Sequence, residues 1–444
     1  MDIKELSGAL RTAGVVGAGG AGFPTYAKLN DKADTIIMNC AECEPLLKLH
    51  RQLLQEHAPE IIKAFEEVAI AVGASNAIIA IKEEYKGTVE ACQYYINEHS
   101  NGSVNLSIHT LPSVYPMGDE VVLIYECTKR VVRPGGLPIE QGVAVFNVET
   151  LYNAYRALVE KEGVYSKCVS VVGEVEHPVT VRVPIGMKIK DVIACAGKIT
   201  CSDPVYLIGG PMMGGFKSDL APVTKTVNAI IVLPRTHPLV YKKTSKFSVS
   251  VARAASSCCQ CQTCTDLCPR HALGHPIQPH MFMRSAANND TTKIEPFVNT
   301  YFCCSCGVCE LYSCPQGLNP RSMMAEYKAG LRKAGVKPPQ VEAAPVDDFR
   351  ELRRVPEHRL EMRLGLSQYN VAAPLDNSIV DTNYVEILLS QHIGAPAIPT
   401  VTVGQQVKVN DLIAQAADGL SVNIHASISG TVKEVTDKAI IIVK

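Results

Sequence analysis

Ten of the seventeen cysteines of this chain fall between residues 258 and 314, in two runs of closely similar spacing. The first run, CCQCQTCTDLCP, places Cys258, Cys261, Cys264 and Cys268 in the pattern C-x2-C-x2-C-x3-C-P. This spacing is typical of a bacterial ferredoxin site for a 4Fe–4S cluster, because a tight loop can bring three thiolates to three corners of one cube. The segment therefore predicts a small iron–sulfur domain.

The second run, CCSCGVCELYSCP, contains Cys303, Cys306, Cys309 and Cys314, with four residues instead of three before the final Cys-Pro pair. We interpret it as a bulged version of the same site, because a proline still follows the last cysteine. In two-cluster ferredoxins the fourth cysteine of a run ligates the other cluster. We therefore predict that Cys314 completes the first cluster and that Cys268 completes the second.

A pair of zinc knuckles is the alternative interpretation of these cysteines. Zinc sites usually combine separated C-x2-C pairs or mixed Cys/His sets, and a repeated triplet followed by Cys-Pro fits them poorly. Cys259 and Cys304 each follow the first ligand of a run. We expect both to be small buried side chains beside the clusters rather than ligands. Two neighbouring clusters can pass electrons one at a time, so the protein needs an electron donor and an electron acceptor.

Charge and hydropathy limit the partners and the cellular location that this electron-transfer protein can have. Lys and Arg number 43 against 44 Asp and Glu, without a basic block, which argues against a nucleic-acid partner. The chain has no run of about 18 apolar residues and no signal peptide at its start, so we predict a protein that neither spans a membrane nor is exported. In a reducing cytosol, cysteines serve more often as metal ligands than in disulfides.

A glycine-rich stretch near the start, GVVGAGGAGFPTYAKL, has Gly17, Gly19 and Gly22 in the order G-x-G-x-x-G. A Rossmann turn needs a strand before these glycines, but residues 3–13 place apolar side chains at helical spacing. Pro24 suits the first turn of a following helix. We therefore predict a glycine loop between two helices. Such a loop can bind phosphate, but it is not an ordinary dinucleotide-binding turn. A plain flexible turn is the alternative. Residues 3–13 could also be a targeting segment, but we favour a first helix.

Three later segments, DTIIMNCAECEP, YPMGDE and VFNVET, each end a β-type run in polar residues. Together with the glycine loop, they resemble segments in the flavin-bearing subunit of respiratory complex I and, more closely, in the C subunit of the Rnf electron-transport complex. The resemblance implies a Rossmann-like α/β domain that holds FMN and NADH. A flavin suits this position, because NADH gives up two electrons as hydride whereas iron–sulfur clusters accept one at a time.

The resemblance also implies which residues hold the nucleotides. The glycines would approach the FMN phosphate and NADH through backbone N–H groups, the next residues would hold the nicotinamide nucleotide, and the later motifs would enclose the flavin. The implied cofactor-binding residues are Gly17, Gly19, Gly20, Gly22, Phe23, Lys28, Asn39, Glu42, Glu44, Tyr115, Gly118, Asn147 and Thr150.

The alternative for the polar members of this set is structural. Asn39 and Asn147 would then cap strands, and Glu42 and Glu44 would form a solvated acidic turn. We assign no catalytic side chain, because hydride and electron transfer need no general acid or base from the protein. Histidines such as His50 are expected to lie at the surface or to be satisfied in the core.

The rest of the chain divides by composition. Residues 166–240 read as short strands around a GGPMMGG turn, and the resemblance implies a β-grasp module, which we expect to be a spacer rather than a ligand site. Residues 336–376 are rich in proline and charge, which indicates a linker with one short helix. Residues 377–444 resemble a lipoyl-like barrel-sandwich hybrid, but the tip segment DGLSVNIHAS lacks a carrier lysine. This tail is therefore expected to be a structural or docking module.

We thus predict a multidomain α/β chain. Its expected parts are a Rossmann-like FMN/NADH domain over 1–165, a β-grasp domain over 166–240, a helical two-cluster ferredoxin-like domain over 241–335, a linker over 336–376 and a barrel-sandwich hybrid over 377–444.

The order of these parts resembles one family in particular. The HIGAPA segment precedes the flavin domain in the Rnf protein but lies near the end of this chain. That order resembles the cobalamin reductases of bacterial propanediol-utilisation microcompartments. The resemblance implies NADH-dependent reduction of corrinoid cobalt, a cytoplasmic microcompartment location, and an adenosyltransferase and shell or lumen proteins as partners. The alternatives are an Rnf-type subunit, a reductase of another microcompartment such as a glycyl-radical system, and a non-enzymatic scaffold. No Asp-x-His-x-x-Gly corrinoid motif is present.

Overall fold

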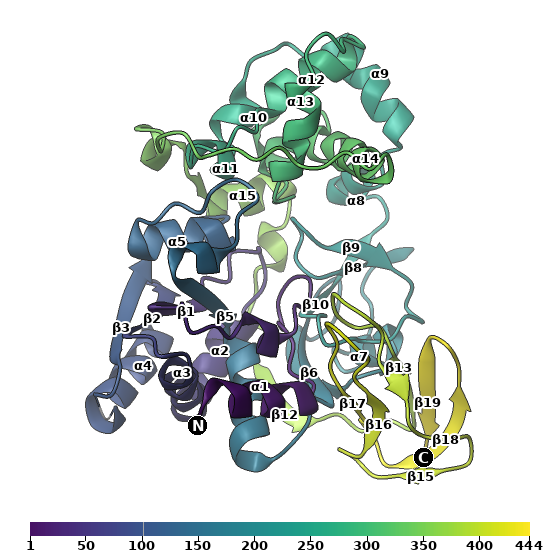
Figure 1. The fold of residues 1–444 in the computed structure, drawn as a ribbon. Coiled ribbons are helices and arrows are strands. Elements are labelled where there is room, and N and C mark those ends of the chain that lie inside the picture. Colours follow the sequence, from purple (N-terminus) through teal and green to yellow (C-terminus); the bar gives the residue numbers. More distant parts are fainter. Residues whose placement is uncertain (101) are drawn as a thin grey trace.

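In the computed structural model, which describes residues 1–100 and 102–444, an α-helical domain lies above an α/β domain, with two β-rich domains beside the latter (Figure 1). The multidomain α/β fold class predicted from the sequence is confirmed.

The α/β domain is built on a four-stranded parallel sheet of order β3-β2-β1-β5. β1 is almost wholly apolar and buried, as expected for a central parallel strand covered on both faces, whereas the edge strand β3 is partly exposed. Its elements are α1 (Ile3–Thr12), β1 (Thr35–Cys40), α2 (Leu49–Glu56), α3 (Ala58–Val72), β2 (Asn76–Lys82), α4 (Lys86–His99), β3 (Asn105–Leu111), β4 (Val114–Tyr115), α5 (Glu120–Thr128), β5 (Val143–Asn147) and α6 (Val148–Tyr155).

A six-stranded sheet of order β12-β7-β6-β10-β8-β9 forms the β-grasp domain. Its edge strand β12 comes from far along the chain and pairs in parallel with β7. The predicted boundary between residues 376 and 377 therefore falls inside a strand. The elements are β6 (Ser166–Gly173), β7 (Val179–Pro184), α7 (Ile189–Ala194), β8 (Pro204–Ile208), β9 (Gly215–Lys217), β10 (Ala229–Pro234) and β12 (Leu375–Ile379).

The cysteine-rich domain is a set of short helices at the top of Figure 1. They pack around a core that includes Phe282, Phe297 and Met323, with cysteines of both runs at its edge. The helices are α8 (Pro238–Lys243), α9 (Phe247–Ser257), α10 (Thr263–Asp266), α11 (Pro269–Ala272), α12 (Pro279–Ala287), α13 (Glu295–Val298) and α14 (Pro320–Lys333).

The predicted linker is more ordered than its composition indicated. It contains the helix α15 (Glu357–Leu364), and its strand β11 (Val355–Pro356) pairs with β4 of the α/β domain. Nζ of the fully buried Lys82 lies 2.5 Å from Oε2 of Glu357. This ion pair holds the linker against the carboxyl end of β2, because neither charge can be left unpaired in the interior without a large cost.

The C-terminal domain consists of two small antiparallel sheets, of order β13-β19-β18-β15 and β14-β16-β17. It packs on the start of the chain, where the Arg11 guanidinium donates to the carbonyls of Ala417 and Ser421. The strands are β13 (Tyr384–Leu388), β14 (Ile398–Pro399), β15 (Gln406–Val407), β16 (Leu412–Gln415), β17 (Ile424–His425), β18 (Gly430–Val435) and β19 (Ala439–Val443).

Lys225 stands where three domains meet. This β-grasp residue is 2% exposed, and its Nζ donates to the carbonyl of Gly14 at 2.7 Å and to that of Asn423 at 3.3 Å. Among residues 1–100 and 102–444, no carboxylate forms an ion pair with it. Burial lowers the pKa of Lys225 to about 7, because the charged form loses its water.

We expect Lys225 to make the flavin-free protein pH-sensitive. Between about pH 7 and 10.5 the unfolded lysine binds more protons than the folded one, so its contribution to stability rises with pH. The melting temperature of the wild type minus that of Lys225→Met should therefore increase from pH 7 to pH 9. The exposed Lys190 is the control: the melting temperature of the wild type minus that of Lys190→Met should not change between pH 7 and pH 9. A Lys225 difference that is constant or falls with pH would contradict this account.

Candidate functional site

The glycine loop is closed as a small hairpin. The backbone N–H of Gly17 donates to the carbonyl of Phe23 at 2.8 Å, and that of Thr25 donates to Val15 at 3.1 Å. One 3-10 turn, Thr25–Lys28, follows the loop instead of the predicted helix. The prediction was wrong there because the bridge between Val16 and Pro24 turns the chain back on itself, and the chain is extended again at Leu29.

The tip of the loop leaves backbone donors unpaired. The backbone N–H groups of Gly19, Gly20 and Ala21 have no hydrogen-bond acceptor within the part of the chain that the structure describes. Gly20 and Gly22 have φ of +77° and +70°, which only glycine adopts at low cost. Successive N–H groups that point outward from such a turn fit an anionic phosphate group.

The end of β5 and the first turn of α6 carry polar residues that support the loop. Thr150 Oγ1 accepts from the N–H of Ala18 at 2.9 Å. Oδ1 of Asn147 caps α6 by accepting from the N–H of Glu149 at 3.0 Å, so its Nδ2 is left facing the loop. A Cβ added to Gly19 would lie 3.1 Å from that Nδ2.

The other predicted residues near the strand ends are joined to one another. Nδ2 of Asn39 donates to the carbonyl of Gly118 at 3.1 Å, and the N–H of Gly118 contacts Sγ of Cys43. Lys28 Nζ lies 3.0 Å from Oε1 of Glu120. Phe23 is 36% exposed at the rim of the loop.

Glu42 is buried and Glu44 is half-buried, and neither lies in a solvated turn. The carboxylate of Glu42 accepts from the N–H groups of His50 and Arg51 at the start of α2. That of Glu44 accepts from the N–H groups of Met212 and Met213, both at 2.8 Å. Burial raises the pKa of Glu44, although these two donors act in the opposite direction.

The GGPMMGG turn of the β-grasp domain thus clasps a carboxylate of the α/β domain. A Cβ at Gly210 would lie 2.1 Å from Oε2 of Glu44, so the close approach requires a glycine. The sequence alone did not distinguish this role from that of a plain turn, because Glu44 and Gly210 lie in different domains.

Tyr115 points away from the glycine loop, toward the cysteine-rich domain. Its hydroxyl donates to the carbonyl of Cys306 at 2.7 Å, and the side chain is 3% exposed. Close by, Arg270 lies 2.9 Å from Asp119, the N-cap of α5. Burial alone would raise the pKa of Asp119, but the Arg270 charge and hydrogen bond hold it below its usual value.

The eight predicted ligands gather around two cavities, and each cavity takes three of these ligands from one run and one from the other. Cys259 and Cys304 also line the cavity of their own run. One cavity is lined by Cys258, Cys261, Cys264 and Cys314. The other is lined by Cys268, Cys303, Cys306 and Cys309.

Each cavity brings together four of the predicted ligands, which is the number of thiolates that a 4Fe–4S cluster takes from a protein.

The extra residue of the second run is absorbed by helix geometry. Residues Val308–Ser313 form a π-helical turn, whereas the equivalent part of the first run forms the α-helix α10. A π turn accommodates one more residue than an α turn, so Cys314 still reaches the first cavity. Of the two adjoining cysteines, Cys304 is half-buried, but Cys259 is exposed, so the expectation of burial is wrong for Cys259.

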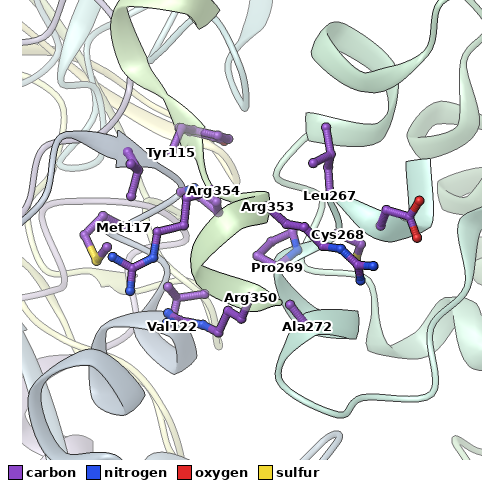
Figure 2. Close-up of a pocket in the computed structure, with 13 residues that line it drawn as sticks. Tyr115, Met117, Val122, Leu267, Cys268, Pro269, Ala272, Arg350, Arg353 and Arg354 are labelled. Carbon is purple, nitrogen blue, oxygen red and sulfur yellow. The ribbon is translucent and has the colours of Figure 1, made fainter. Parts of the chain in front are cut away.

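A third cavity lies between the α/β and cysteine-rich domains (Figure 2). Tyr115 and Met117 lie on one side, Cys268 on the other, and arginines of the linker enter it. Arg350 and Arg354 both pair with Glu126 of α5. The sequence analysis missed these arginines because the run DFRELRR has the composition of a solvated linker.

His50 was set aside in the sequence analysis as a satisfied or surface residue. It is 7% exposed, and its Nδ1 lies 3.4 Å from Nδ2 of Asn147. Its Nε2 is buried without a hydrogen-bond partner in the described part of the chain, so it is not a satisfied core residue. Burial lowers the pKa of His50.

Four family models match the chain in the order of the structural domains. They are the Nuo51 FMN-binding domain at residues 10–156, the SLBB domain at 168–215, a 4Fe-4S dicluster domain at 257–319 and the RnfC barrel sandwich hybrid domain at 372–443. The chain is therefore an oxidoreductase of the flavin and iron–sulfur electron-transfer class.

Full-length relatives narrow this class to one family. The chain is 38% identical over 445 residues to the cobalamin reductase PduS of Citrobacter freundii, which covers 100% of this chain and 97% of that protein. The same identity holds over 446 residues of the Salmonella typhimurium cobalamin reductase PduS. The protein belongs to the PduS cobalamin reductase family.

More distant relatives share only part of the chain. The C subunit of the ion-translocating oxidoreductase complex of Edwardsiella ictaluri is 32% identical over 279 residues, 62% of this chain and 33% of that protein. An NAD+-reducing NiFe hydrogenase, solved in its H2-reduced state, superposes with a TM-score of 0.52 at 22% identity and covers 76% of this chain and 64% of the hydrogenase chain. The second match shows a shared fold. In the described residues, no helix is both long and apolar enough to cross a membrane.

The crossed cysteine sets lead to a test by iron content. We expect about eight iron atoms per reconstituted wild-type chain, and about four in each of Cys314→Ser and Cys268→Ser, because each variant loses a different 4Fe–4S cluster. Electron paramagnetic resonance of the reduced variants should show two different remaining signals. Cys259→Ala and Cys304→Ala should keep about eight iron atoms. Loss of the same signal from both serine variants would contradict the crossed arrangement.

The position of Glu42 predicts a structural effect. Glu42→Ala should lower the free energy of unfolding of the flavin-free chain by about 1–2 kcal/mol, because two N–H groups at the start of α2 lose a buried acceptor. Urea unfolding monitors this loss. Glu67→Ala on the exposed face of α3 is the control and should change stability by under about 0.5 kcal/mol. If Glu42→Ala alters FMN affinity but not stability, the carboxylate acts on the cofactor instead.

Proposed function

We propose that the protein is an NADH-dependent enzyme that carries electrons through FMN and two 4Fe–4S clusters to the cobalt of cobalamin. Full-length similarity to the PduS cobalamin reductases and the matching order of four domains support the proposal. The acceptor is taken from the names of these relatives. The recycling of coenzyme B12 in propanediol utilisation, inside a bacterial microcompartment with an adenosyltransferase as partner, follows from the resemblance and belongs to the proposal.

The observation that carries the electron-transfer part is the junction at Tyr115. The YPMGDE segment that joins the α/β domain to the second cysteine cavity uses Tyr115 on the Cys306 carbonyl and Asp119 on Arg270. Gly118, in the same segment, contacts Asn39 at the end of β1. One short loop therefore lies against both the proposed flavin site and the proposed cluster site, which suits transfer between them.

The residues of this chain bind and orient the cofactors in this proposal. Backbone N–H groups of the glycine loop hold nucleotide phosphate, and Asn39, Asn147 and Thr150 fix the strand ends around it. The cysteines of the two cavities are the cluster ligands. Bound FMN would accept two electrons from NADH and release them singly, which is the chemistry that a two-electron donor and one-electron acceptors require.

The two cavities differ in exposure. The second contains the buried Cys268, Cys306 and Cys309 and adjoins the α/β domain, whereas the first includes the exposed Cys261. An external acceptor can approach the first cavity more closely. We therefore propose that cobalamin, or the protein that carries it, meets the chain on this side.

The test is anaerobic reconstitution of the full chain with iron, sulfide and FMN, followed by NADH and hydroxocobalamin. The visible spectrum of the corrinoid should change from cobalt(III) to a reduced form only when NADH and FMN are both present. Cys261→Ala should abolish this change while the flavin still bleaches with NADH. Cys127→Ala, which removes a thiol outside both cavities, should behave as the wild type.

Two other outcomes would change the proposal. If flavin and clusters bleach with NADH but cobalamin stays oxidised, the acceptor is wrong, and a protein acceptor of the Rnf or glycyl-radical kind is favoured. If NADH bleaches neither cofactor, the electron source is wrong.

A further inference from the structure

A segment of the β-grasp domain, residues 224–228, runs along the glycine loop. A Cβ at Gly22 would lie 2.8 Å from Cγ2 of Thr226, and one at Gly19 would lie 3.8 Å from Nδ2 of Asn228. At the start of the loop, Lys225 donates to the carbonyl of Gly14. The β-grasp domain therefore lies against the glycine loop at Gly19 and Gly22.

The orientation of Asn228 follows from its neighbour. Its Oδ1 accepts from Nζ of the buried Lys167 at 2.7 Å. An ammonium group can only donate, so this contact assigns the oxygen and turns Nδ2 toward Gly19. That Nδ2 has no acceptor within residues 1–100 and 102–444.

The space beside Gly19 is therefore surrounded by donors from two domains. Nδ2 of Asn147, in the α/β domain, and Nδ2 of Asn228, in the β-grasp domain, both face it, and the loop adds backbone N–H groups. The nearby carboxylate of Glu149 is already occupied by Lys167 and the N–H of Cys168. A ligand that only accepts hydrogen bonds fits these surroundings.

We propose that Asn228 of the β-grasp domain completes, with Asn147 and the glycine loop, a binding site for a nucleotide phosphate group. The inference rests on the proposed function and gives the β-grasp domain a binding role that the sequence analysis did not expect. The phosphate belongs either to FMN or to the pyrophosphate of the dinucleotide donor, and the two sources share the same chemistry.

The test is Asn228→Asp in the full chain. Aspartate keeps an acceptor for Lys167 but replaces the donor beside Gly19 with a negative oxygen. Affinities for FMN and riboflavin are measured by quenching of flavin fluorescence, and that for NADH by titration calorimetry. We expect the Kd of the phosphate ligand to rise by about 10- to 100-fold, while riboflavin, which lacks the phosphate, binds as it does to the wild type.

The arms of the experiment identify the source of the phosphate. A weaker FMN affinity with unchanged riboflavin affinity places the flavin phosphate in this binding site, and a weaker NADH affinity alone places the dinucleotide there. Unchanged affinity for both FMN and NADH overturns the inference but leaves the proposed function standing. Failure of the wild type to bind either nucleotide overturns both.

Two further variants guard against a change in folding. Asn228→Ala removes the donor without adding a charge, and Lys167 keeps Glu149 as its partner, so it should weaken the same ligand by about tenfold. Asn377→Asp is the matched control, because Asn377 is half-buried on β12 of the same sheet but contacts His57 instead. Equal weakening of riboflavin and FMN by Asn228→Asp would indicate a general disturbance and overturn the inference.

Discussion

The hydrogen bond from Tyr115 to the Cys306 carbonyl joins the two halves of the molecule on which any electron transfer depends. It is supported by the pair between Asp119 and Arg270, which comes from the residues next to Tyr115 and to Cys268. The Tyr115 contact is buried and the Asp119 pair is partly buried, so water replaces the first only at a cost. They hold the carboxyl edge of the parallel sheet against the second cysteine cavity.

Buried charges hold the remaining domains around the same edge. Glu44 is clasped by the β-grasp turn, Lys82 binds Glu357 of the linker helix, and Lys167 binds Glu149. The contacts of Glu44 and Lys82 join segments far apart in the sequence, and each would leave a charge without its partners if the other segment moved away. Lys225 differs, because backbone carbonyls are its only partners among the residues described.

The sequence was most informative where a local pattern sets the structure. The apolar spacing of residues 3–13 predicted α1, and the apolar run before Asn39 predicted β1. It was less informative where a partner lies elsewhere in the chain. Pro24 was expected in the first turn of a helix but forms a β-bridge with Val16. A solvated turn was the structural alternative for Glu42 and Glu44. Instead, Glu42 accepts from N–H groups at the start of α2, and Glu44 accepts from N–H groups of the β-grasp domain. Composition suggested a linker with one short helix, which is α15, but it did not indicate that the arginines of Figure 2 pair with Glu126 of α5.

The sequence by itself determined the class of chemistry, because three thiolates within seven residues form a cluster-binding loop whatever surrounds them. It also determined the order of the domains and, through that order, the family. Only the tertiary structure decided which side chains meet. The π-helical turn before Cys314, the direction of Tyr115 and the donors that Asn147 and Asn228 turn toward Gly19 depend on contacts between distant segments. Local residue patterns do not predict such contacts, because each contact depends on a partner in another part of the chain.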